Sequence, residues 1–390
     1  MKKACISCLM CYNGRESIAK ETVMRNFKYA ARSTAAAMMI VALSWMQTTN
    51  AAPAEPSASP AELPPAAVKT AAKPSSYYAY IPDHSIYFVD ADAQYDWAYP
   101  AIDFLAASNV ASGVGDHLFA PDQPITRADF MVMLYRAYDM SAYSAPATFA
   151  DVPDGAYYAD AVGAAETLGI AAGSSGSFSP REHVTREDAV VFLKRTLDLT
   201  GLRFESAAPS GFTDMDKVSP YAAEAVAALS TAGVLSGSGD GTLNPQDEIT
   251  RAEMAALLYR ALHLTDEGVY SDQPDLLNLC IGDTIYTDVR VQGGLPAGSY
   301  KGLVRCLTFY ETADGYFIEL GGAEEFDQQV SYQDGALTVD GKPFDLAQDA
   351  VCVNVSPYST LDAPVSTGSE YRAAKVAVLD GLVTEIYYSA

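Results

Sequence analysis

The chain has 390 residues, of which 49% are apolar, so it is long enough for two or three domains that each bury a core. Its 49 Asp and Glu residues outnumber 25 Lys and Arg, giving a formal net charge of −24 that repels nucleic acid and anionic membrane. We therefore expect no nucleic-acid partner, and any anionic ligand must be bound by a few local positive groups.

Residues 1–51 are predicted to be an export signal. A basic stretch from Arg25 to Arg32 precedes an apolar run from Ala35 to Met46, and small residues end at Ala51 and Ala52. The apolar run is too short for a stable transmembrane helix. We therefore expect a secreted protein that does not span the membrane once the signal is cleaved.

Three cysteines precede this signal, at Cys5, Cys8 and Cys11, with a spacing that resembles an iron–sulfur ligand run. Met24 opens a well-formed signal of its own, so it is a possible true start of translation. Either start removes these cysteines from the mature protein, and we predict no metal site and no cofactor.

Residues 52–85 are predicted to be a linker. Its first part, up to residue 76, holds prolines among alanines and serines and has no apolar periodicity that would build a core. These prolines are Pro53, Pro56, Pro60, Pro64, Pro65 and Pro74.

Three repeats follow, over residues 86–140, 147–200 and 210–264. Each has a Phe-x-Asp motif, an aromatic residue, an amphipathic helical pattern, a glycine-rich turn and a second helix that starts with a Thr-Arg pair. The Phe-x-Asp acids are Asp90, Asp151 and Asp214, the aromatic residues are Trp97, Tyr157 and Tyr221, and the arginines are Arg127, Arg186 and Arg251.

This ordered set of landmarks resembles the S-layer homology family over roughly residues 86–264. The resemblance implies a three-armed, pseudo-threefold α-helical spindle at the cell wall or cell surface. It also implies grooves between repeats that bind secondary cell-wall polysaccharide, often through a pyruvylated, negatively charged sugar, or another anionic glycan linked to peptidoglycan. The three acids, three aromatic residues and three arginines named above are the predicted polymer-binding residues.

The arginines support an anionic ligand on physical grounds. Thr126, Thr185 and Thr250 stand at N-cap positions with an acid three residues later, a capping-box pattern. An arginine in the next position opposes the helix macrodipole, which favours anions there. A guanidinium beside free helix amides binds a carboxylate or phosphate; the alternative is a salt bridge to the acid of Phe-x-Asp.

The aromatic residues are predicted either to stack on sugar rings or to plug the core. Only the first repeat has tryptophan, which makes its groove the best candidate. The second repeat has Glu187 where its siblings have alanine, and this charge beside Arg186 is expected to weaken anion binding. We therefore predict larger losses of wall binding for Arg127→Ala and Arg251→Ala than for Arg186→Ala.

Residues 275–390 change from helical spacing to alternation and predict a small antiparallel, barrel-like β domain, so that the fold class is α+β multidomain. Asp314-Gly315, Asp340-Gly341 and Asp380-Gly381 favour tight hairpins. One pair among Cys280, Cys306 and Cys352 is a possible disulfide, and the sequence leaves the pairing open.

Catalysis is not expected. All four histidines, His84, His117, His183 and His263, lie before residue 266, which excludes histidine-based triads from the β domain and disfavours zinc there. Besides wall anchoring, two alternatives remain: a structural subunit of a surface lattice, which implies self-association, and a surface glycan hydrolase that uses a carboxylate pair.

Overall fold

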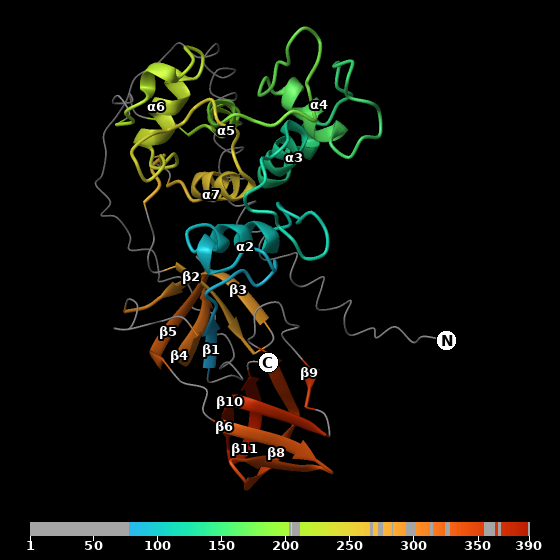
Figure 1. Cartoon of the computed structure of the whole chain (residues 1–390), viewed down its shortest axis with the longest axis vertical. Coiled ribbons are helices and arrows are strands. Elements are labelled where there is room, and N and C mark those ends of the chain that lie inside the picture. The colour runs from blue at the N-terminus through green and yellow to red at the C-terminus, as the bar shows by residue number, and fades with distance from the viewer. Residues whose placement is uncertain are drawn as a thin grey trace, which may run out of the picture.

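The computed structural model describes residues 78–388 except 203, 205–210, 266–267, 272–275, 283, 294–301, 313–314, 324–327, 355–362 and 366–367. The predicted signal and most of the predicted linker lie outside the described residues. The described chain forms a helical spindle at one end, a closed β-barrel in the middle and a second sheet at the other end (Figure 1). These parts confirm the α+β multidomain class.

The spindle contains two α-helices from each repeat. The first helices bury an apolar face, and each second helix packs on the first helix of the next repeat: α3 on α4, α5 on α6, and α7 back on α2. The ring of three arms is thereby closed. The first helices are α2 (Tyr99–Ala107), α4 (Ala159–Thr167) and α6 (Ala223–Thr231), and the second are α3 (Arg127–Ala137), α5 (Arg186–Leu199) and α7 (Arg251–Leu262).

Backbone hydrogen bonds join the three repeats just before their second helices. The amide of Ile125 donates to Ile249 (3.1 Å), that of Ile249 to Val184 (2.9 Å), and that of Val184 to Ile125 (3.1 Å). Each repeat therefore donates to one neighbour and accepts from the other. This closed cycle is the pseudo-threefold centre of the spindle.

The glycine turn is needed to seat the phenylalanine of Phe-x-Asp. A Cβ at Gly113, Gly173 or Gly237 would lie 2.6, 2.5 or 2.7 Å from the ring of the phenylalanine in its own repeat. Real Cβ atoms do not approach a ring so closely, so only glycine fits. Phe88 and Phe149 are buried as a result.

The β region is more complex than the single antiparallel domain we predicted. It has two modules, each with one parallel strand pair, β3–β5 and β8–β11. The closed barrel has the order β1-β2-β3-β5-β4, from β1 (Tyr78–Ile81), β2 (Leu276–Ile281), β3 (Thr284–Val291), β4 (Gly302–Thr312) and β5 (Gly315–Ala323). The second sheet comprises β6 (Gln328–Gln333), β7 (Ala336–Val339), β8 (Lys342–Asn354), β9 (Ala363–Pro364), β10 (Ser369–Leu379) and β11 (Leu382–Tyr388).

Two of the three predicted Asp-Gly hairpin turns can be followed in the described residues. Asp340 and Gly341 have φ of 50° and 74°, and Asp380 and Gly381 have 53° and 83°. Two successive residues of positive φ are typical of type I′ turns, whose twist suits a hairpin. The turn between β6 and β7 has the same conformation at Asp334-Gly335, which was not among the predicted hairpin turns.

Strand β1 corrects the predicted linker. Residues 78–81 lie inside the range 52–85, yet they pair with β2 and β4 and close the barrel. In the order of the sequence, the spindle is therefore inserted between the first and second strands of the barrel. A four-residue strand whose partners lie about two hundred positions away has no local signal, so the sequence could not reveal it.

The spindle contacts the barrel through a small polar and aromatic cluster. His263 Nε2 and the Tyr259 hydroxyl both lie 2.8 Å from the Asp288 carboxylate of β3, and Phe104 packs against both rings. Asn278 of β2 donates to the Pro100 carbonyl at 2.9 Å. We call this contact the joint.

Residues at the joint depart from the threefold repetition. Phe104 has alanine at both equivalent positions, and His263 has aspartate at both. Buried Asp103, where the other repeats have Gly163 and Ala227, accepts hydrogen bonds from the Ser85 hydroxyl and the Ile86 amide. These substitutions adapt one side of the spindle to the barrel.

The joint is expected to be more stable at acidic pH. Burial raises the pKa of Asp103 to about 7, against the hydrogen bonds that lower it. Burial lowers the pKa of His263, but Asp288 outweighs this and holds it above its usual value. Both groups bind protons more tightly when folded, so their stabilisation is lost as pH rises through their folded pKa values.

Thermal unfolding at pH 5 and pH 8 tests this expectation. Asp103 should contribute on the order of a few kcal/mol to the difference in free energy of unfolding. Asp103→Asn should therefore flatten the pH dependence relative to the unmodified chain. An identical pH dependence in the two proteins would contradict it.

Two further features concern the whole described chain. Cys280, Cys306 and Cys352 are all buried free thiols, so no disulfide joins them. Among the described residues, no helix combines the length and apolarity that crossing a membrane requires.

Candidate functional site

The threonines cap the second helices as predicted. Thr126, Thr185 and Thr250 each accept a hydrogen bond from the amide three residues later, at 3.2 to 3.3 Å. Only α7 has the full reciprocal capping box, in which the Glu253 carboxylate also accepts from the Thr250 amide. Helix capping therefore accounts for the geometry that the three repeats share at the starts of their second helices.

The helix amides are not free to bind an anion, in contrast to the prediction. The amide of Arg127 donates to the Glu182 carbonyl at 2.8 Å, and the next amide donates to Pro180 at 3.0 Å. Equivalent bonds hold the starts of α5 and α7. An anionic ligand must therefore rely on side chains.

Each predicted arginine reaches across to the turn of the next repeat. The Nε atoms of Arg127, Arg186 and Arg251 donate to the carbonyls of Phe178, Leu243 and Phe119, at 2.9, 2.7 and 2.7 Å. The arginine bonds run from each repeat to the one that follows it, which is opposite to the direction of the backbone cycle. Each arginine therefore belongs to the surface of the neighbouring repeat.

The ion-pair partner of the arginine is the capping acid of the next repeat. Arg127 Nη1 lies 3.5 Å from Asp188, and Arg186 Nη1 lies 2.5 Å from Glu253. The alternative that we weighed, a direct salt bridge to the acid of Phe-x-Asp, is therefore wrong for these two arginines.

The acids of Phe-x-Asp instead hold the turns. Asp90, Asp151 and Asp214 each accept two backbone amides from the segment after the glycine turn, at 2.7 to 2.8 Å. Burial raises the pKa of Asp214, but these amides outweigh burial and hold it below its usual range. These three acids therefore have a structural role: their carboxylates are used to hold backbone amides.

The three aromatic residues are exposed and are not core plugs. Trp97 is 50% exposed, Tyr157 70% and Tyr221 56%. Each lies against the second helix of the preceding repeat: the Tyr157 hydroxyl donates to Asp129 at 2.7 Å, and that of Tyr221 to Asp188 at 2.8 Å. Their ring faces can contact a ligand.

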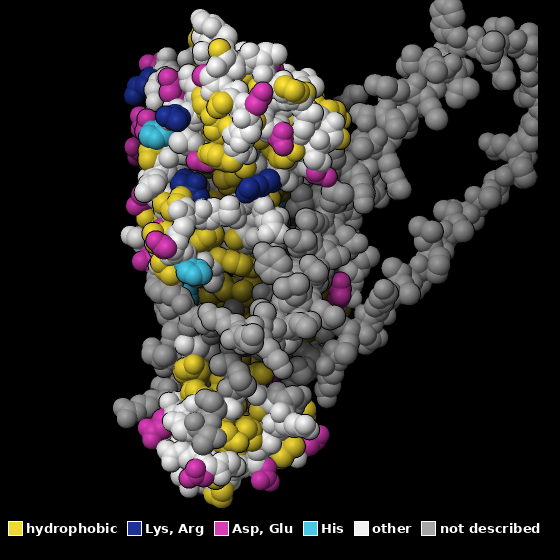
Figure 2. Space-filling model, turned by 90° about the vertical axis from the view of Figure 1, so that its right-hand side faces the viewer, with side chains coloured by type: hydrophobic (Ala, Val, Ile, Leu, Met, Phe, Trp, Pro, Cys, Tyr) yellow, Lys and Arg dark blue, Asp and Glu magenta, His cyan; other side chains and the backbone are white. Residues whose placement is uncertain are grey.

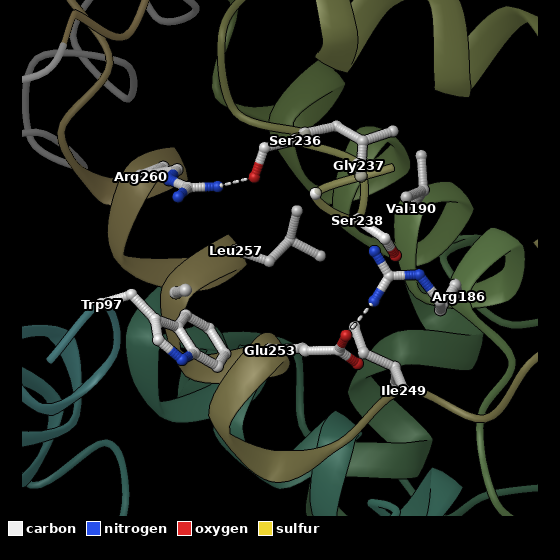
Figure 3. A pocket seen from close by; sticks show the side chains of 13 residues that line it. Trp97, Arg186, Val190, Ser236, Gly237, Ser238, Ile249, Glu253, Leu257 and Arg260 are labelled. Atoms are coloured by element: carbon white, nitrogen blue, oxygen red, sulfur yellow. Dashed lines mark hydrogen bonds and ion pairs between the residues drawn. The ribbon is translucent and has the colours of Figure 1, made fainter. Parts of the chain in front are cut away.

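A pocket of about 350 Å³ lies beside Trp97. Figure 3 shows Trp97 and Arg186 on opposite sides of Leu257, with Arg260 and Ser236 along another edge. The pocket thus combines an aromatic face, an apolar floor and two guanidinium groups. The remaining lining residues are Val190, Leu235, Gly237, Ser238, Gly239, Ile249, Glu253 and Ala256.

This site is built from all three repeats. Trp97 comes from the first, Arg186 from the second, and Glu253 and Arg260 from the third. We name this group of four the Trp97 site. Its threefold equivalents are the Tyr157 site (Tyr157, Arg251, Asp129, Arg136) and the Tyr221 site (Tyr221, Arg127, Asp188, Arg195, with Glu187).

Each repeat has a second arginine that was not among the predicted site residues. Arg136, Arg195 and Arg260 each follow the first arginine by nine positions. Arg260 donates to Ser236 at 2.5 Å, and Arg195 donates to the Ile170 carbonyl at 2.8 Å. The constant spacing was the signal that could have revealed them.

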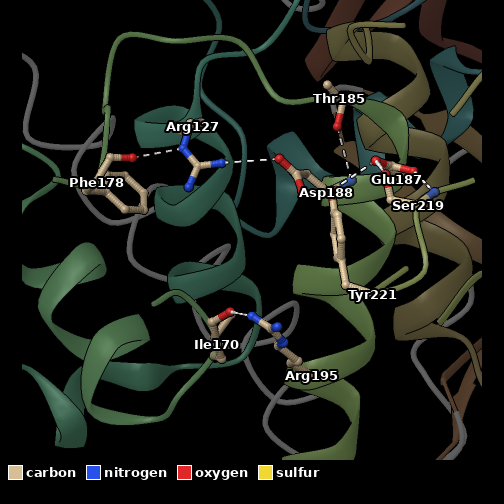
Figure 4. A network of polar contacts seen from close by, with 9 residues as sticks. All are labelled: Arg127, Ile170, Phe178, Thr185, Glu187, Asp188, Arg195, Ser219 and Tyr221. Carbon is tan, nitrogen blue, oxygen red and sulfur yellow. Dashed lines mark hydrogen bonds and ion pairs between the residues drawn. The ribbon is translucent and has the colours of Figure 1, made fainter. Parts of the chain in front are cut away.

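Glu187 acts at the Tyr221 site, which corrects its predicted effect on Arg186. Its carboxylate accepts from the Ser219 amide (2.9 Å), the Ser219 hydroxyl (2.7 Å) and the Tyr221 hydroxyl (3.0 Å). Figure 4 shows this network continuing through Asp188 to Arg127. The arginine in the same site as Glu187 is therefore Arg127.

The positive charge of the molecule is uneven. On the face in Figure 2, the visible Lys and Arg side chains lie at the helical end among apolar side chains, while acidic side chains occur at both ends. Within the described part of the chain, no group of three His, Cys, Asp or Glu side chains is placed to hold a metal ion.

Comparison with known proteins identifies the repeats. The S-layer homology domain model matches residues 87–131, 148–190 and 211–255. The chain is 28% identical over 298 residues to a surface-layer 125 kDa protein of Lysinibacillus sphaericus, which covers 73% of this chain and 25% of that protein.

Two further relatives match less of this chain. It is 30% identical to an amylopullulanase of Thermoanaerobacterium thermosulfurigenes over 44% of this chain and 9% of that protein. It is 31% identical to a cell surface protein of Thermoanaerobacter kivui over 42% of this chain and 20% of that protein. The chain thus spans a quarter or less of the length of these relatives.

Proposed function

The chain carries three S-layer homology domains, which anchor surface proteins to the cell wall, and from this premise we propose that its ligand is an anionic, pyruvylated secondary cell-wall polysaccharide. The Trp97 site carries this proposal. A sugar ring stacks on the exposed indole, while its carboxylate pairs with Arg186 or Arg260. Such a pair works locally against the −24 net charge of the chain.

Sedimentation with purified cell-wall fragments tests this function. The protein is expected to co-sediment with untreated walls and to stay in the supernatant after the wall polysaccharide, or only its acidic ketal, has been removed. Undiminished co-sedimentation with treated walls would refute the anionic ligand.

Replacement of the indole tests the stacking role. Trp97→Ala is expected to weaken binding by about 1.5 kcal/mol, roughly tenfold, because the sugar loses its aromatic face. The matched control is Tyr221→Ala at the equivalent position, for which we expect a smaller loss. Isothermal titration with a pyruvylated methyl glycoside measures both.

We propose that the chain itself is not catalytic. This rests on the lack of histidine in residues 266–390 and on a candidate site whose groups suit binding. Incubation with wall polysaccharide should leave its mass distribution unchanged, and a fall in polymer mass would indicate a surface hydrolase.

A second candidate is a subunit of a surface lattice. It is favoured by the likeness to the surface-layer 125 kDa protein, because 298 aligned residues exceed the helical spindle alone. Light scattering of the purified chain, with and without calcium, separates the two functions. A lattice subunit grows into large particles, whereas an accessory anchored protein stays small.

A further inference from the structure

One of the three sites differs in charge from the other two, although all three occupy equivalent places. The Trp97 site holds Arg186 and Arg260 against one acid, Glu253. The Tyr221 site also holds two arginines, but against two acids, because Glu187 stands where the other repeats have Ala128 and Ala252. The second acid cancels the positive charge that a carboxylate ligand needs.

Glu187 is a fixed, ionised part of the Tyr221 site. It is 2% exposed. Burial raises the pKa of Glu187, but the hydrogen bonds from Ser219 and Tyr221 outweigh burial and hold it below its usual value. The carboxylate is therefore negative at neutral pH, where the ligand carboxylate is also ionised, and it repels the ligand.

Glu187 also fixes the aromatic side chain. The Tyr221 hydroxyl lies 3.0 Å from Glu187 and 2.8 Å from Asp188, so the ring is tied to the first turn of α5 at two points. Tyr157 has a single such bond, to Asp129. Trp97 has no hydroxyl to form either one. Among the three aromatic side chains, Tyr221 is therefore held in place by the most hydrogen bonds to the second helix of the preceding repeat.

Two phenylalanines enclose the arginine of the Tyr221 site. The Arg127 guanidinium lies 5.0 Å from the ring centre of Phe178 and 5.1 Å from that of Phe192. At the Trp97 site the equivalent residues are Leu243 and Leu257. Leucine is smaller than phenylalanine, and Leu257 lines the pocket beside Trp97. The Trp97 site has two leucines where the Tyr221 site has two phenylalanine rings, and the smaller side chains leave more room for a ligand.

We infer that the Tyr221 site is closed to wall polysaccharide by Glu187 and Phe192, and that the Trp97 site is open. This inference rests on the proposed function, since it excludes the anionic sugar from one of three related sites. The S-layer homology repeats of this chain are thus not interchangeable: one site serves as a structural contact between the second and third repeats.

The test exchanges residues that the chain itself uses at equivalent positions. Glu187→Ala/Phe192→Leu gives the Tyr221 site the residues found at Ala252 and Leu257, and Leu257→Phe gives the Trp97 site the residue found at Phe192. Isothermal titration with a pyruvylated methyl glycoside counts the sites. The double variant should gain one site per chain, and Leu257→Phe should lose one.

Controls separate the possible failures. Glu187→Gln preserves the size of the side chain and removes its charge, and circular dichroism verifies that each variant retains its helices. Absence of any binding to the unmodified chain would overturn the proposed function. Binding to the unmodified chain with the same number of sites in a folded double variant and in folded Leu257→Phe would overturn only the closure of the Tyr221 site.

Discussion

Arg186→Ala is expected to weaken binding of the pyruvylated glycan about thirtyfold, equivalent to roughly 2 kcal/mol. The Arg186 side chain is only 10% exposed, and it lies opposite Trp97 across the pocket. Its removal takes one of two cations from the ligand and leaves Glu253 without its ion-pair partner. Isothermal titration with the methyl glycoside measures the loss.

Arg127→Ala is the matched control for this prediction. Arg127 donates to the turn of the next repeat in the same way, so both variants lose a similar structural contact. Thermal unfolding should therefore change by similar amounts, while binding should fall much less for Arg127→Ala. The ranking reverses the expectation from sequence, and a larger loss of binding for Arg127→Ala would restore that expectation.

Removal of β1 is expected to unfold the barrel while the spindle stays folded. In this strand Ala79 is 0% and Ile81 3% exposed, and both belong to the barrel core. Loss of their burial costs roughly 3 to 5 kcal/mol, a large part of the stability of a small domain.

Limited proteolysis of two chains checks this prediction. A chain that begins at residue 82 should be cut rapidly between residues 276 and 323, whereas one that begins at residue 77 should resist. Both should keep their helical circular dichroism and their binding to cell walls. Equal protease resistance of the two barrels would show that β1 is dispensable.

Local patterns in the sequence were sufficient for the repeats and their helix starts. Thr126, Thr185 and Thr250 cap helices because the capping motif acts over three residues. The apolar spacing of the first helices and the Asp-Gly turns of the β region act over similarly short distances. Such features form wherever the same few residues recur.

The composition of the sites could not be predicted in the same way. Each arginine extends into the next repeat, so Arg186 lines the same pocket as Trp97 of the first repeat and Glu253 of the third. Sequence adjacency instead placed Glu187 beside Arg186, although the two side chains serve different sites. The closed cycle of repeats, and not the spacing within one repeat, decides which side chains meet.

The fluorescence of Trp97 tests the central claim most directly. The chain has two tryptophans, and Trp45 lies in the predicted signal, so a chain that begins at residue 77 contains Trp97 alone. Titration with the pyruvylated methyl glycoside should change its emission saturably, and the same sugar without pyruvate should not. Calorimetric binding of the pyruvylated sugar without any change in Trp97 emission would contradict the assignment of the ligand to this site.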